Sequence, residues 1–166
     1  MKKTSAGLLL YRIKDDQLEV MLAHMGAPWW AKKDKGAWTI PKGEYTDEQP
    51  LNAAKREFKE ELSLDPPPGE LIELGEIDQK NNKTVTAWAI EADLDVGNIK
   101  SNTFEMEWPP RSGVVQEFPE IDRAAWFDIS KATEKIIPAQ AEFFERLAKK
   151  LGRQAGPQPP SQSSLF

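Results

Sequence analysis

Cysteine is absent from this chain of 166 residues, and His24 is its single histidine. The lack of cysteine excludes disulfides, thiolate zinc sites, iron–sulfur clusters and a cysteine nucleophile, and one histidine cannot build a multi-histidine zinc site. Any bound metal ion must therefore be held by oxygen atoms. We expect His24, which falls in a predicted strand, to be a hydrogen-bonded structural residue rather than a catalyst.

Long apolar runs and an excess of basic residues are also missing. The first apolar run, residues 8–11, is too short for a signal peptide core or a membrane span. We therefore expect a cytoplasmic protein without a membrane partner. The net charge of −5 disfavours general binding to nucleic acid backbones, although a locally basic pocket for one small phosphorylated ligand is compatible with it.

The length fits a single domain that can bury enough apolar surface to fold without a disulfide or a structural metal. We expect this domain to span residues 1–152. Residues 153–166 are rich in proline, glutamine and serine, and we expect a disordered tail there.

Apolar periodicity and turn residues predict a mixture of strands and helices. Strands are expected at 5–12, 18–25, 37–40, 71–79, 83–93 and 124–127, and helices at 50–62, at 138–151, and from Asp128 or Ser130 to Ile137. We expect Pro41 to end the third strand. The segment 97–120 is ambiguous, because 104–108 could form a strand whereas 109–113 is irregular.

Three acids, Glu57, Glu60 and Glu61, are spaced i, i+3 and i+4 in the helix predicted over 50–62. Helical geometry places Glu57 and Glu61 beside the apolar stripe, with Glu60 and Arg56 on the outer flank. Like charges four residues apart repel, and a hard divalent cation such as Mg²⁺ or Mn²⁺ would compensate them. On spacing alone, a solvated acidic face balanced by neighbouring basic residues is an equal alternative.

The region around this helix resembles the Nudix box, whose pattern is Gly, five residues, Glu, seven residues, Arg-Glu-U-x-Glu-Glu-x-Gly-U, where U is a bulky apolar residue. The matching positions are Gly43, Glu48, Arg56, Glu57, Phe58, Glu60, Glu61 and Leu64. Two departures are visible. Only four residues separate Gly43 from Glu48, and Ser63 stands where glycine is expected, so we expect an altered turn at the end of the helix.

The resemblance implies an α/β class domain with the Nudix fold, an α/β/α sandwich with a mixed β-sheet. It also implies a Mg²⁺-dependent pyrophosphohydrolase that cleaves a phosphoanhydride bond in a nucleoside diphosphate linked to another group. Dinucleoside polyphosphates of the diadenosine tetraphosphate type are slightly preferred, with nucleoside triphosphates, ADP-sugars and capped RNA 5′ ends as alternatives. A Nudix-fold sensor that binds a nucleotide without cleaving it is the contrasting class.

The same resemblance implies roles for individual residues. The metal ligands would be Glu57, Glu60, Glu61 and the carbonyl of Gly43. Glu60, oriented by Arg56, would share the metal or act as general base. Glu120 is the alternative base or a further ligand, with Glu117 as its rival.

Contacts to a small-molecule nucleotide substrate are expected from loops near the box. Lys42 precedes Gly43 and could meet a phosphate, and Trp29 or Trp30 could stack on a base. Arg111 would contact phosphate or base only if it points inward. The segment 102–113 either walls the substrate pocket or is simply a packed irregular loop.

Overall fold

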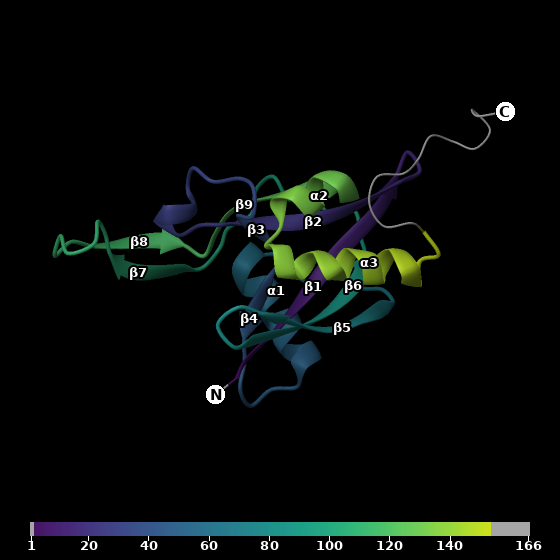
Figure 1. The fold of residues 1–166 in the computed structure, drawn as a ribbon, viewed down its shortest axis with the longest axis horizontal. Helices are drawn as coiled ribbons and strands as arrows, with labels where there is room; N and C mark the ends of the chain where they lie inside the picture. The colour runs from purple at the N-terminus through teal and green to yellow at the C-terminus, as the bar shows by residue number, and fades with distance from the viewer. Residues whose placement is uncertain (1, 154–166) are drawn as a thin grey trace.

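The computed structural model describes residues 2–153, which form one mixed seven-stranded sheet with helices on both faces (Figure 1). The strands of this sheet are β1 (Lys3–Lys14), β2 (Gln17–Met25), β3 (Trp38–Thr39), β4 (Lys42–Glu44), β5 (Leu71–Gln79), β6 (Lys83–Glu91) and β9 (Ile121–Asp128). The order along the sheet is β3-β2-β1-β6-β5, with β4 also paired to β1 and β9 to β2. Strands β1 and β6 are parallel and the other pairs antiparallel.

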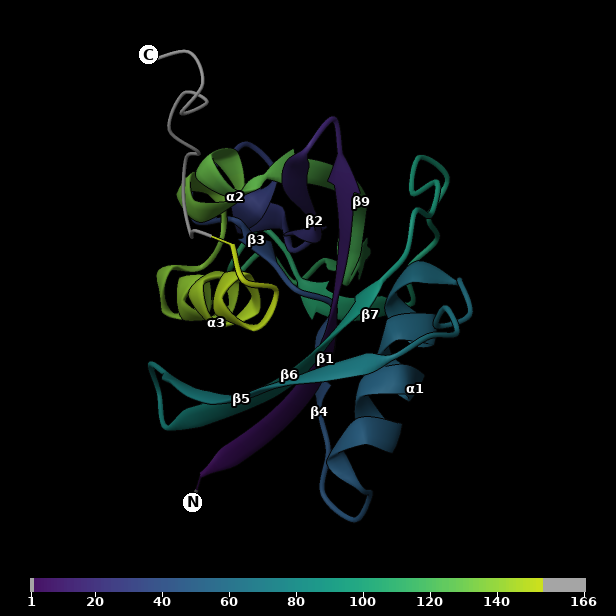
Figure 2. The same cartoon turned by 90° about the vertical axis from the view of Figure 1, so that its right-hand side faces the viewer.

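Helix α1 (Pro50–Leu62) covers one face of this sheet, whereas α2 (Ile129–Lys135) and α3 (Glu142–Lys150) cover the other (Figure 2). The predicted α/β/α sandwich with a mixed sheet is therefore confirmed. Alternating side chains of β1 supply both cores, because successive residues of a strand point to opposite faces. Leu8 and Leu10 pack in the α1 cluster, and Leu9 and Tyr11 pack in the α3 cluster.

The predicted bounds of helix α1 agree with the structure. Pro50 occupies a first-turn position, where its missing N–H costs nothing. Phe58 and Leu62 are fully buried against the sheet. The helix ends at Leu62, and the capping residue Ser63 has a left-handed backbone with φ of 54°. Serine thus adopts the conformation that glycine favours, and its hydroxyl donates to the carbonyl of Lys100.

Strand β4 is an element that the sequence analysis missed. Pro41 does end β3, but the chain then pairs with β1, where Ala6 faces Gly43. This close approach needs Gly7, because a Cβ there would lie 2.5 Å from the carbonyl oxygen of Pro41. Tertiary pairing rather than local β propensity forms this strand.

A separate two-stranded ribbon, β7 (Thr103–Glu107) and β8 (Val115–Pro119), lies in the ambiguous segment. The possible strand at 104–108 is thus present, and β8 is a further strand that was not expected. At the other predicted helices, Asp128 caps α2 by accepting from the N–H of Lys131. The helix expected over 138–151 begins as the 3₁₀ turn η2 (Pro138–Ala141) before α3.

The described part of the chain contains no helix that is long and apolar enough to cross a membrane. The disordered tail predicted from residue 153 lies, beyond Arg153, outside the described residues and stays a prediction.

Candidate active site

A cavity of about 420 Å³ brings most of the predicted metal and catalytic residues together. Its walls come from β1, β4, β6, α1 and the residues that flank the ribbon. The lining residues are Ser5, Lys42, Gly43, Glu44, Glu57, Glu60, Glu61, Lys83, Asn102 and Glu120. Four of these residues, Ser5, Glu44, Lys83 and Asn102, were not predicted, because no local pattern marks them. The pairing of β1 with β4 and β6 and the return of the ribbon place them here. The site is thus assembled from distant segments around one helix.

Glu61 is the most buried acid of this cavity, with 8% of its surface exposed. Its Oε2 atom is buried and has no hydrogen-bond partner among the described residues. Burial raises the pKa of Glu61 to about 8, and the nearby Lys42 ammonium opposes that rise. A buried carboxylate oxygen without a donor is costly, so this atom needs a proton or a cation.

Glu57 lies directly over the backbone of Gly43. A Cβ built on Gly43 would be 2.0 Å from the Glu57 Cδ atom, so only glycine fits while Glu57 keeps this position. Burial raises the pKa of Glu57, and its ion pair with Arg56 opposes the rise. The contact holds the Glu57 carboxylate against the backbone of Gly43, so that a side-chain ligand and a main-chain segment belong to the same site.

Arg56 gathers three carboxylates around one guanidinium. It donates to Glu48 at 2.6 Å, to Glu57 at 2.9 Å and to Glu60 at 3.2 Å. These hydrogen bonds, of which the one donated to Glu48 has the largest effect, raise the pKa of Arg56 further above its usual range. Arg56 therefore stays charged and holds Glu57 and Glu60 in position. Glu48 in turn holds Arg56 through its hydrogen bond.

Lys42 places an amine beside the acids. Burial lowers the pKa of Lys42, while the charge of Glu61 acts in the opposite direction. Together with Lys83 it supplies positive charge to a cavity that is otherwise acidic. Such a mixture suits a phosphate group that binds next to a cation.

The donor set fits a hard divalent cation. Glu57, Glu60 and Glu61 offer only oxygen atoms, and Glu61 Oε2 is left open. Within residues 2–153, no three acidic or histidine side chains already surround one point as a preformed cage. The fit therefore depends on donor chemistry and on the open oxygen atom. Mg²⁺ sites often have few protein ligands, because substrate phosphates and water complete them.

Glu120 and Glu117 are separated clearly. Glu120 lines the cavity from the loop before β9, and its backbone is fixed by Asn102 and Gly26 through hydrogen bonds of 3.0 Å each. Glu117 is exposed on β8 opposite Glu105 and does not line the cavity. Geometry favours Glu120 over its rival as the loop acid.

The remaining predicted contacts do not line this cavity. Trp29, in the 3₁₀ turn η1 (Pro28–Trp30), is 46% exposed, whereas Trp30 packs against the core. Arg111 lies exposed between β7 and β8. His24 is fully buried, with Nδ1 2.8 Å from Asp122 Oδ1 and Nε2 2.7 Å from the carbonyl oxygen of Lys33, so its expected structural role is confirmed.

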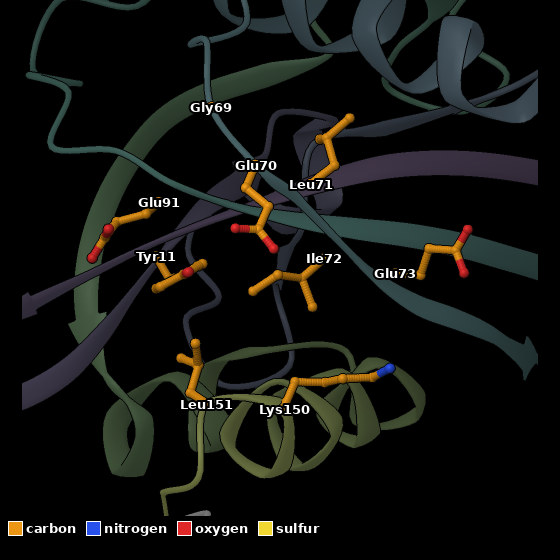
Figure 3. Close-up of a pocket in the computed structure, with 9 residues that line it drawn as sticks. All are labelled: Tyr11, Gly69, Glu70, Leu71, Ile72, Glu73, Glu91, Lys150 and Leu151. Carbon is orange, nitrogen blue, oxygen red and sulfur yellow. The ribbon is translucent and has the colours of Figure 1, made fainter.

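A larger cavity of about 610 Å³ lies near the other end of β1 (Figure 3). Tyr11, Glu70, Glu91 and Lys150 are among its lining residues. The picture shows the Lys150 side chain extending away from the carboxylates of Glu70 and Glu91. None of the helix acids reaches this cavity, so its size alone does not make it the candidate active site.

Comparisons with known proteins agree with this geometry. The model of the NUDIX domain family matches residues 1–147. No curated protein matches the chain. Among solved structures, a C. elegans Ap4A hydrolase binary complex is 21% identical, with a TM-score of 0.62 and coverage of 90% of this chain and 98% of that chain.

Two further structures share the fold. The NUDIX domain of Shewanella oneidensis NrtR, complexed with ADP ribose, is 14% identical, with a TM-score of 0.58 and coverage of 91% and 89% of the two chains. A MutT protein from Methanosarcina mazei is 18% identical, with a TM-score of 0.57 and coverage of 92% and 96%. These identities are low, so the likeness shows the fold. Together with the family match over most of its length, it means that this chain belongs to the NUDIX domain family.

Proposed function

We propose that this protein is a pyrophosphohydrolase that uses a divalent cation to cleave a phosphoanhydride bond in a nucleoside diphosphate linked to another group. Membership of the NUDIX domain family supports a hydrolase that acts on pyrophosphate bonds. The observation that carries the proposal is the open, buried Oε2 atom of Glu61 in a cavity shared with Glu57, Glu60 and Lys42.

The chemistry of the reaction explains this arrangement. Phosphate oxygens repel an attacking water, so positive charge must offset them and a base must take a proton from the water. Mg²⁺ or Mn²⁺, held by Glu57, Glu60, Glu61 and the carbonyl of Gly43, would supply that charge at the phosphates. Arg56 keeps Glu57 and Glu60 in place through its hydrogen bonds.

The protein residues provide the remaining steps. Lys42 receives a phosphate oxygen at the edge of the cavity, which positions the anhydride against the acids. Glu60 or Glu120 accepts the proton of the attacking water, since both carboxylates line the cavity. The phosphate on the far side of the cleaved bond leaves with the bridging oxygen.

The favoured substrate is a dinucleoside polyphosphate of the diadenosine tetraphosphate type. The enzyme would cleave it in the cytoplasm. The likeness to an Ap4A hydrolase supports this choice. Nucleoside triphosphates, ADP-sugars and capped RNA ends would use the same acids, because the helix sets the chemistry and loops set the substrate. The ADP-ribose complex of the NrtR domain supports the second candidate, a domain that binds such a nucleotide without cleaving it.

The test is hydrolysis of a nucleotide panel by purified protein with Mg²⁺, read as released phosphate and as separated products. Glu61→Gln should lower kcat by about a hundred-fold or more, the scale of losing a catalytic group. Glu145→Gln is the matched control, because it removes the same charge from an exposed position on α3. Tight nucleotide binding without turnover in the wild type would favour the sensor, and full turnover in Glu61→Gln would contradict the proposed site.

A further inference from the structure

The β7–β8 ribbon grows directly out of the carboxylate cavity. Asn102, just before β7, and Glu120, just after β8, both line that cavity. A hydrogen bond of 3.0 Å from the N–H of Glu120 to the carbonyl of Asn102 closes the base of the ribbon. Figure 1 shows the ribbon projecting from the body of the molecule. One wall of the cavity therefore continues outward along the ribbon.

One face of this ribbon is apolar. Along β7 and the residue after it, Phe104, Met106 and Trp108 are half-buried, whereas Glu105 and Glu107 between them are exposed. Phe118 of β8 faces Phe104, with ring centroids 6.2 Å apart. The alternation follows from strand geometry, which puts every second residue on the same face.

Trp29 meets this face from the turn η1. Its ring centroid is 6.3 Å from that of Trp108, and the ring planes are tilted by 52°. Trp29 is nevertheless 46% exposed, which is unusual for so large an apolar ring that already has an aromatic neighbour. The two indoles form an open corner, in which a planar ligand can stack on one ring and touch the other with its edge.

The distance from the acids decides what the corner can hold. Strand β8 has five residues between the cavity and the Trp108 end of the ribbon, a length of about 17 Å. A ligand that occupies both places needs a planar ring separated from the reacting anhydride by a long spacer. A nucleobase at the end of a polyphosphate chain has this form, and stacking suits it because every base has a π face.

We propose that Trp29 and Trp108 hold the second nucleobase of a dinucleoside polyphosphate whose phosphate chain crosses the carboxylate cavity. This inference rests on the proposed function and adds the residues that select a substrate with two bases over one with a single base. Because stacking tolerates different bases, the corner selects for the presence of a ring more than for its identity.

The test compares diadenosine tetraphosphate with adenosine tetraphosphate, which has the same number of phosphates and lacks the second nucleoside. Trp29→Ala should raise KM for the dinucleotide about ten-fold, with kcat within about two-fold, and leave KM for the mononucleotide unchanged. Trp29→Phe should recover most of the loss, because it restores an aromatic face. Ile13→Ala is the control, since Ile13 is 45% exposed and lies at the far end of β1.

Binding to Glu61→Gln protein, measured by calorimetry, separates this inference from the proposed function. Adding Trp29→Ala or Trp108→Ala to that variant should weaken binding of the dinucleotide alone. Equal weakening for both nucleotides, or none for either, overturns the inference. If the wild type binds the dinucleotide with this Trp29 dependence and hydrolyses neither compound, the proposed hydrolase fails and the base site stands.

Discussion

The carboxylate of Glu61 and the amine of Lys42 lie close together where water has little access. The charge of each stabilises the charged state of the other. Burial nevertheless dominates, since it raises the pKa of Glu61 to about 8 and lowers that of Lys42. In the metal-free protein near neutral pH, Glu61 is therefore largely protonated. A cation that binds Glu61 must displace this proton, which makes cation binding weaker as the pH falls.

This raised pKa predicts a pH-dependent stability difference between the wild type and Glu61→Gln. The native state holds the Glu61 proton more tightly than the unfolded state, whose carboxyl has the ordinary value of 4.5. The stabilising contribution is therefore complete below about pH 4.5 and lost as the pH rises to about 8. Glutamine is neutral throughout, so the variant should gain up to a few kcal/mol relative to the wild type across this window.

Urea unfolding in the presence of EDTA, repeated across that pH range, measures the difference in free energy of unfolding. Glu145→Gln serves as the control, and its difference from the wild type should not follow the same curve, since Glu145 is exposed. A constant difference for Glu61→Gln would show that Glu61 is not a dehydrated acid. Mg²⁺ should reverse the trend for the wild type, because it stabilises the ionised form.

Two adjacent tryptophans show that the environment of a single side chain cannot always be predicted from the sequence. Trp29 and Trp30 are adjacent and chemically identical, yet the first is exposed beside Trp108 and the second packs against the core. Spacing identified the acids of the helix because the 3.6-residue period fixes their relative directions. No local sequence pattern predicts which of two adjacent tryptophans in a turn will be buried. Their side-chain directions depend on contacts with the β7–β8 ribbon, which is distant in the sequence.

At the scale of elements, the site depends on the contact between β4 and α1. Helix α1 could be predicted with its bounds, since proline at its start and apolar periodicity both mark it. Strand β4 is three residues long and follows a proline, so only its pairing with β1 creates it. The geometry of the ligands at Gly43 and Glu57 therefore depends on both β4 and α1, and only α1 could be predicted from the sequence.

This contact predicts a sharp effect of Gly43→Ala. The added Cβ would lie 2.0 Å from Glu57 Cδ and 2.2 Å from Oε2, so Glu57 must move. Displacing a ligand by about 1 Å can cost about a hundred-fold in kcat, and overpacking typically costs about 1–3 kcal/mol of stability. Steady-state kinetics and thermal melts should show both losses, with the fall in kcat persisting well below the melting temperature.

Gly97→Ala is the matched substitution, because its Cβ would meet only Asp95 Oδ1, at 3.3 Å, outside the cavity. It should leave kcat unchanged. Wild-type kcat in Gly43→Ala protein would mean that Glu57 can leave its present position without consequence, and that it does not act at this site.

At the scale of the whole molecule, the side-chain amide of Gln140 joins the layer of α2 and α3 to strands at opposite ends of the sheet. Gln140 in η2 is fully buried. Its carbonyl accepts from the N–H of Ile40 at 3.0 Å, and its NH₂ donates to Thr39 Oγ1 at 3.0 Å and Gln79 Oε1 at 2.9 Å. Because β3 and β5 lie at opposite ends of the strand order, this side chain bridges the sheet. Apolar periodicity predicted the layers, but no local pattern reveals hydrogen bonds across 61 to 101 residues.

Gln140→Leu should therefore destabilise the whole domain without altering the reaction. Leucine has a similar volume, yet it leaves the Ile40 N–H and the Thr39 hydroxyl without this partner inside the core. Each buried group that loses its partner costs about 1–3 kcal/mol, so with two such groups the free energy of unfolding should fall by about 2–6 kcal/mol in urea titrations. Gln49→Leu, at an exposed position whose side chain makes no capping bond, should change the free energy of unfolding little.

Because Gln140 does not line the carboxylate cavity, kcat of Gln140→Leu measured well below the unfolding transition should equal that of the wild type. A loss of kcat in fully folded Gln140→Leu protein would mean that the layer behind the sheet controls the acids in front of it, and unchanged stability would mean that the amide does not join the layers.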